Sequence, residues 1–184
     1  MELSTQTQIL FYLKTHNICY DISLSEGLVR IFLIIRNQEL CPNQIIESSL
    51  WFHTDCLEVK TYYTLTGSEW CKSNKNKHPD LFRLINYINK NIWLNLCDGS
   101  GQALYKPCCL YTPRLSMSED EGDIAITTVI PYDFFLVAPI ESCDYFTAFC
   151  PEFLNKLSPA IFFLLLGKFD YEDSKNYIEK TLLK

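Results

Sequence analysis

The sequence lacks a long hydrophobic run and a recognisable secretory pattern. Its longest unbroken apolar stretch, Ala160 to Leu166, has seven residues, whereas a helix that spans a bilayer needs about 20. The first residues, Met1 to Gln6, contain neither the basic nor the apolar segment of a signal peptide. We therefore expect a soluble, cytoplasmic protein with no membrane partner.

The chain also lacks an excess of basic residues. It has 16 Lys and Arg against 22 Asp and Glu, which gives a formal net charge of -6 and a pI near 5.1. This charge repels phosphate backbones unless basic residues gather in one patch. The only such cluster, Lys72, Lys75 and Lys77, is typical of a polar linker. Nucleic acid is therefore not an expected partner.

Signature motifs of catalysis and cofactor binding are missing as well. No GxSxG elbow occurs, and the turn at 98–101 lacks the Lys-Ser/Thr that follows the glycines of a phosphate loop. The acidic stretch Ser118 to Asp123 does not have the ligand spacing of an EF-hand and indicates a solvated loop. We predict no catalytic residues and no cofactor.

Cysteine, in contrast, is abundant, with nine residues. An odd number of cysteines without a signal peptide favours reduced thiols, most of them small buried hydrophobic residues. His53 and Cys56 are three positions apart, and Cys108 and Cys109 are adjacent. Adjacent side chains on a strand point to opposite faces, so these four do not form the paired ligands of a structural zinc site. No metal is expected.

Size and hydrophobic periodicity predict the fold class. A chain of 184 residues that is 48% hydrophobic suits one domain, residues 1–184, with a sizeable core. Helical spacing that begins at a capping-box-like Thr5 predicts a first helix to His16. Four strands follow from alternating or continuous apolar residues, the second of them expected to be central and buried on both faces. They are Ile18–Leu24, Leu28–Ile35, Ile45–Phe52 and Cys56–Leu65.

The second half repeats the change from helix to strand. Pro79 starts an amphipathic helix, and strands are predicted near 93–96, 104–111 and 124–130. Pro151 and Pro159 are each expected to start a helix of a C-terminal helical extension, residues 140–184, packed on the domain. This order predicts an α+β fold with antiparallel sheet backed by helices.

Three stretches carry a resemblance to a known family: 80–89 running into Trp93 and Leu94, 110–114, and 151–161. Together with the element order, they resemble YbjN-like bacterial proteins, whose fold is shared with the chaperones of type III secretion. The resemblance implies small acidic proteins, often dimeric, that hold or regulate other proteins. The long helical tail departs from the family pattern, which leaves open whether it covers the sheet face that a partner would need.

Aromatic residues in or beside the strands are the candidate partner-binding residues: Trp51, Tyr62, Tyr63 and Trp93. Tryptophan and tyrosine are enriched at interfaces, although they are also ordinary core residues. Tyr62 and Tyr63 are adjacent, so alternation predicts that one of them faces solvent or a partner.

The sequence therefore favours a non-enzymatic protein-binding module with a chaperone-like or regulatory role. Its partner would be another protein or a second copy in a homodimer, bound at a sheet edge or on a sheet face. The rival hypothesis is a small cysteine-dependent enzyme or ligand sensor with a pocket between the sheet and the tail helices. A single fast-reacting cysteine would distinguish the rival.

Overall fold

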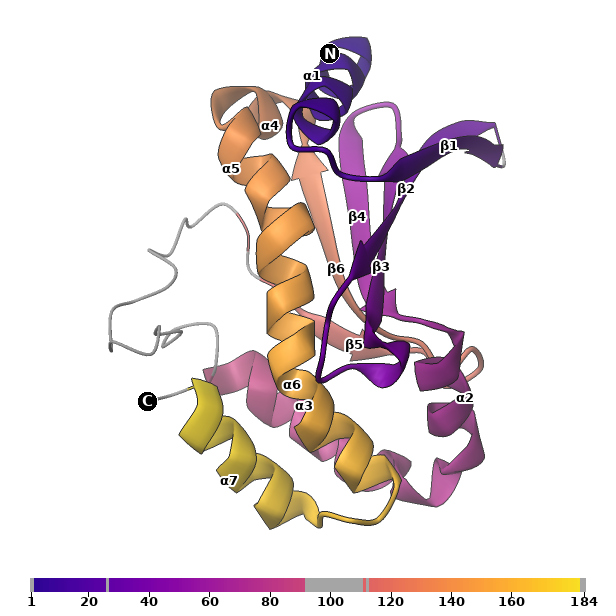
Figure 1. Ribbon diagram of the computed structural model, residues 1–184, viewed down its shortest axis with the longest axis vertical. Helices are drawn as coiled ribbons and strands as arrows, with labels where there is room; N and C mark the ends of the chain where they lie inside the picture. The colour runs from indigo at the N-terminus through magenta and orange to yellow at the C-terminus, as the bar shows by residue number, and fades with distance from the viewer. Residues whose placement is uncertain (1, 26, 92–110, 112, 183–184) are drawn as a thin grey trace.

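The computed structural model describes residues 2–25, 27–91, 111 and 113–182, and Figure 1 shows their arrangement. Six antiparallel strands form one open sheet in the order β1-β2-β3-β4-β6-β5, so the predicted α+β class is confirmed. The strands are β1 Tyr20–Ser25, β2 Leu28–Arg36, β3 Ile45–Phe52, β4 Cys56–Tyr63, β5 Leu115–Met117 and β6 Ile124–Pro131. The helices are α1 Glu2–Thr15, α2 Leu65–Ser73, α3 His78–Asn91, α4 Tyr132–Val137, α5 Pro139–Asp144, α6 Cys150–Leu165 and α7 Tyr171–Leu182.

The β3–β4 hairpin shows most clearly how the sheet acquires two different faces. Buried and partly exposed residues alternate along all of β4, because successive side chains of a strand point to opposite sides. Leu57, Val59, Thr61 and Tyr63 point to the core face. Glu58, Lys60 and Tyr62 therefore point to the opposite face, here called the open face.

The helices lie on the core face. In Figure 1 the long helix made of α5 and α6 runs along the sheet, with α3 and α7 packed near its lower end. α6 contacts β3 and β4, and the Tyr63 hydroxyl donates a 2.6 Å hydrogen bond to the Leu154 carbonyl oxygen. Segment 140–184 contributes Phe153, Leu157 and Ile178 to the same hydrophobic core as the sheet. The helical tail thus occupies the core face, and no described helix packs across the open face.

The expected position of β2 is wrong. It is second from the edge of the sheet, and only alternate residues such as Ile31 and Leu33 are buried. Its other face carries Arg30, Phe32 and Ile34 on the open side of the sheet. The sequence of β2 is almost continuously apolar because apolar side chains also occupy the open face of this strand.

The expected helix start at Pro159 is also wrong. Pro159 lies inside α6, and α5, a π-helical turn at Tyr145–Phe149 and α6 form one continuous helix. An interior proline removes one backbone hydrogen bond. Burial of most of the surrounding helix, including Leu157 and Ile161, offsets that loss.

Other local predictions differ at the helix ends. α1 begins at Glu2, so Thr5 is a buried residue inside the helix and is not its N-cap. α2 and α4 are not predicted from the sequence. α2 ends at Ser73, so of the three lysines expected in a polar linker it contains only Lys72, and Lys75 and Lys77 lie in a 3₁₀ turn before α3. The strands predicted near 93–96 and 104–111 lie outside the described residues, apart from Tyr111, which is not in a strand.

One helix of the described residues, Pro139–Leu165, is long and apolar enough to span a membrane by length and composition. Its most apolar window is 67% buried inside the protein. Burial of this extent is typical of the core helix of a soluble protein.

Candidate functional site

The open face of the sheet carries a cluster of aromatic and charged side chains from three adjacent strands. Strand register places Arg30 of β2 beside Trp51 of β3, and Ser49 of β3 beside Lys60 of β4. Tyr62 of β4 is opposite Glu47 of β3. Residues far apart in the sequence are therefore neighbours here because antiparallel pairing fixes their register.

Arg30 is the centre of this cluster. Its guanidinium carbon lies 4.9 Å from the centroid of the Trp51 ring and 5.2 Å from that of Phe32. Its Nη2 donates to Ser49 Oγ at 2.6 Å and to the Tyr62 hydroxyl at 3.4 Å. Cation–π contacts and hydrogen bonds together hold the guanidinium close to two aromatic rings. We call Arg30, Phe32, Ser49, Trp51 and Tyr62 the Arg30 cluster.

An acidic loop forms one side of this surface. Asp123 accepts hydrogen bonds from Lys60 Nζ at 3.2 Å and from Ser68 Oγ of α2 at 2.7 Å. Glu121 and Asp123 line a shallow hollow of about 450 Å³. Its other sides are formed by sheet residues, including Arg30, Trp51 and Tyr62, and by Leu65, Ser68 and Lys72 of α2. The exposed residues 119–121 agree with the predicted solvated loop, whereas its end, at Gly122 and Asp123, is docked against the protein.

Burial perturbs two acidic groups on the open face. It raises the pKa of the Glu47 carboxyl above its ordinary value, although the nearby Arg30 charge acts in the opposite direction. It also raises the pKa of the Tyr62 hydroxyl, with the hydrogen bond to Ser49 opposing the shift. The surface is therefore partly desolvated in the free chain, which strengthens its electrostatic contacts.

Two of the four candidate partner-binding residues lie on the open face. Trp51 and Tyr62 are both in the Arg30 cluster and partly exposed. Tyr63 is buried on the core face, so the predicted alternation of the two tyrosines is confirmed. It borders the hollow beside the Arg30 cluster but is only 1% exposed. Trp93 lies outside the described residues.

Sequence reasoning missed Arg30, Ser49 and Lys60. The available signal was Arg30 itself, the one charged residue within the apolar run 28–35. A charged side chain is almost never fully buried without a partner, so its presence argues against a strand buried on both faces.

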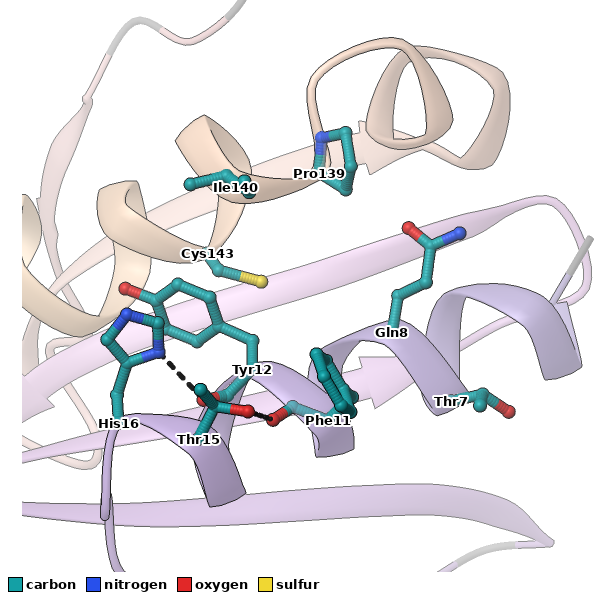
Figure 2. A pocket seen from close by; sticks show the side chains of 9 residues that line it. All are labelled: Thr7, Gln8, Phe11, Tyr12, Thr15, His16, Pro139, Ile140 and Cys143. Atoms are coloured by element: carbon teal, nitrogen blue, oxygen red, sulfur yellow. Dashed lines mark hydrogen bonds between the residues drawn. The ribbon is translucent and has the colours of Figure 1, made fainter.

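A second feature is a groove between α1 and α5, with a cavity of about 400 Å³ (Figure 2). Figure 2 shows Cys143 of α5 extending into the groove, across from Tyr12 of α1. The Tyr12 ring stacks on His16 with 4.0 Å between ring centroids. The Tyr12 hydroxyl donates to Asp144 Oδ1 at 2.5 Å. Burial raises the pKa of Cys143 to about 12, so the thiol stays protonated at neutral pH and is a weak nucleophile.

The other buried thiols of the described residues have raised pKa values as well. Cys71 Sγ lies 3.6 Å from His78 Nε2, but burial, with a contribution from Asp123, raises the Cys71 pKa to about 11. Burial also raises the pKa of Cys41 and of Cys150 to about 12. A catalytic cysteine needs the opposite shift.

The residues considered for metal binding do not converge in the described structure. His53 Nε2 pairs with Glu58 Oε2 at 3.2 Å, and Cys108 and Cys109 lie outside the described residues. Within the described ranges, no group of three or more His, Cys, Asp or Glu side chains could hold a metal ion.

No protein-family model, curated protein or solved structure matches the chain. The resemblance to YbjN-like proteins and secretion chaperones therefore stays a prediction.

Proposed function

We propose that this protein is a non-enzymatic module that binds a partner polypeptide on the open face of its sheet, in a chaperone-like or regulatory role. The observation that carries the proposal is the Arg30 cluster, an arginine in contact with two aromatic rings on a face that no described helix covers. Its partner is an extended or helical segment of another protein.

The composition of the cluster suits an interface. Tryptophan, tyrosine and arginine are the residues most enriched among those that dominate binding energy. Trp51, Tyr62 and Arg30 are all partly exposed, so each keeps surface that a partner can cover.

The cluster is also ordered before binding. Arg30 already makes its hydrogen bonds to Ser49 and Tyr62 and its ring contacts to Phe32 and Trp51. Immobilising a long side chain on binding costs about 0.5–1.5 kcal/mol, and a side chain that is already held loses less. Around the cluster, Glu58, Lys60 and Asp123 supply charged groups for a polar rim.

The state of the thiols supports binding in preference to the rival cysteine chemistry. The raised pKa values of Cys71 and Cys143 work against a thiolate at neutral pH.

A site-directed crosslinking experiment tests the proposal. A photo-crosslinking amino acid replaces Trp51 in one chain and Phe11, an exposed aromatic residue of α1, in the control. We expect a partner polypeptide to crosslink from position 51 and not from position 11.

The affinity of that partner is then measured for the substituted chains. We expect Trp51→Ala to weaken binding by more than about tenfold, as for an interface anchor, and Phe11→Ala to leave it unchanged. Equal crosslinking from both positions, or equal affinities for both variants, would contradict binding on the open face.

A further inference from the structure

The two edge strands of the sheet, β5 and β1, differ in the partners of their outward backbone groups. At the β5 edge, Asn89 of α3 accepts a hydrogen bond from the Leu115 backbone N–H and donates one to the Leu115 carbonyl oxygen, both at 2.9 Å. The side chain amide thus occupies backbone groups that could pair with another strand. At the β1 edge, residues Tyr20 to Leu24 are all exposed, and in Figure 1 the β1–β2 hairpin projects away from the helices.

β1 nevertheless has the pattern of a strand that should be half buried. Tyr20, Ile22 and Leu24 are opposite Leu33, Ile31 and Val29 of β2 and therefore share the core face of the sheet. Yet they are 39%, 49% and 77% exposed. The sequence predicts a strand wet on one side only; β1 is exposed on both, because the helical layer does not extend over it. An apolar row beside a free strand edge is a template for pairing.

The same three residues present their backbone groups to the free edge. Ser25 and Leu28 form the last pair before the hairpin turn, and the closing pair of a two-residue hairpin is hydrogen-bonded. Bonded and non-bonded pairs alternate along an antiparallel ladder, so Ser25, Ser23 and Asp21 bond to β2. The N–H of Ile22 accordingly donates to the Asp21 side chain, Oδ1, at 2.9 Å.

From these observations we propose that a second copy of this chain pairs with β1, antiparallel, with Ile22 opposite Ile22 of the other copy. Tyr20 of each copy is then opposite Leu24 of the other. In this register the outward N–H and C=O groups of the two strands form hydrogen bonds with each other. Because the paired residues share one face of the sheet, their apolar side chains also pack together. A two-fold axis normal to the sheet relates the copies, so the interface is self-complementary.

In the proposed dimer, the two-fold axis normal to the sheet leaves the open faces of both copies on the same side of one continuous sheet. β3 is the third strand from the edge, so five strand spacings of about 4.8 Å separate the two Trp51 positions by about 24 Å. The pairing does not depend on the proposed function, but it would present two Arg30 clusters side by side.

The test uses the hydrogen bond that the edge can form. Ile22→Pro removes the outward N–H without removing a bond to β2, which is the setting in which strands tolerate proline. Sedimentation from micromolar to millimolar concentration should show reversible dimers for the wild-type chain and for Ile22→Val, and monomers for Ile22→Pro. Backbone amide exchange at Ile22 and Leu24 should slow as the wild-type concentration rises.

A disulfide test fixes the register. In a Cys19→Ser background, which removes the exposed native thiol near β1, Ile22→Cys places two thiols in a directly opposed pair. Opposed Cα atoms are about 5.5 Å apart, within the disulfide range, and mild oxidation should crosslink the copies through position 22, as mapped by peptide mass. Ser23→Cys, which bonds to β2 and points to the other face, should not crosslink.

The proposal would be overturned by a wild-type chain that stays monomeric throughout the range, by dimers that persist in Ile22→Pro, or by equal crosslinking of the two cysteine variants. Protection of Ile22 only when an extended segment of another protein is added would overturn it too. Because Trp51 lies on β3, Trp51→Ala should leave the dimer intact, which separates this result from a failure of open-face binding.

Discussion

Gly122 offers the sharpest check on how the acidic loop is held beside the open face. Its φ is +68°, and its N–H donates to the Ser118 carbonyl oxygen at 2.8 Å. A Cβ at this position would lie 2.6 Å from the backbone oxygen of Ser68 and 2.9 Å from Lys72 Cγ, both on α2. Gly122→Ala should therefore push the loop away from α2 and weaken the contacts of Asp123.

The expected cost has two parts. A left-handed conformation costs an alanine about 1 kcal/mol relative to glycine, and forcing a methyl group against backbone adds about 2 kcal/mol. The total, about 3 kcal/mol, should lower Tm by about 6–12 °C in a chain of this size. Thermal and urea unfolding, followed by circular dichroism, would measure both quantities.

Gly167 provides the matched control. Its φ is +70°, but the nearest atom to an added Cβ is Lys77 Cε at 3.9 Å, an ordinary contact. Gly167→Ala should therefore cost only the conformational part, about 1 kcal/mol or about 2–4 °C. If the two variants lose the same stability, the close approach of the loop to α2 is refuted.

Two further predictions concern titratable groups. Because the folded pKa of Glu47 is raised above its ordinary value of 4.5, its contribution to stability is greatest below that value and is lost as pH rises through the folded pKa. Glu47→Gln should therefore raise Tm at neutral pH, with the gain shrinking toward acid, whereas Glu69→Gln on exposed α2 surface should not; a Tm–pH series without this difference would refute the shift. For the thiols, alkylation at neutral pH mapped by peptide mass should modify exposed Cys19 quickly. The four buried thiols with raised pKa values should react slowly until the chain unfolds: Cys41, Cys71, Cys143 and Cys150. A fast reaction at any of the four would instead favour the cysteine-dependent rival.

Local periodicity was enough to predict the parts of the fold whose burial is decided by neighbours in sequence. The bounds of β3 are those predicted. The helix predicted to be amphipathic from Pro79 is α3, which buries Leu81, Leu84, Ile85 and Ile88 along one face. Alternation through β4 also separated Tyr62 from Tyr63. In each case one regular period matches one buried face, so the pattern and the structure carry the same information.

The remaining features depend on contacts that local periodicity does not contain. Pro159 predicts a helix start, because an interior proline removes one backbone hydrogen bond of a helix. In the structure, tertiary burial of α6 outweighs that loss. The Arg30 cluster depends on the register between β2, β3 and β4, so Ser49 and Tyr62 could not be assigned to Arg30 beforehand. The exposure of β1 depends on where the helical layer ends. That position is determined by other parts of the chain, so it cannot be predicted from the residues of β1.

The two unprotected parts of the sheet have a common origin. Among the described residues, the long α5–α6 helix and the helices packed against it lie on the core face, and α2 only borders the open face. Burial of the core by these helices therefore covers neither the centre of the open face nor the β1 edge. A free apolar edge is an aggregation hazard unless a defined partner closes it. Self-pairing at β1 would remove that hazard and set two Arg30 clusters about 24 Å apart. A partner with two matching segments would then bind the second cluster as an intramolecular step, so its affinity would exceed that of one cluster without any new contact.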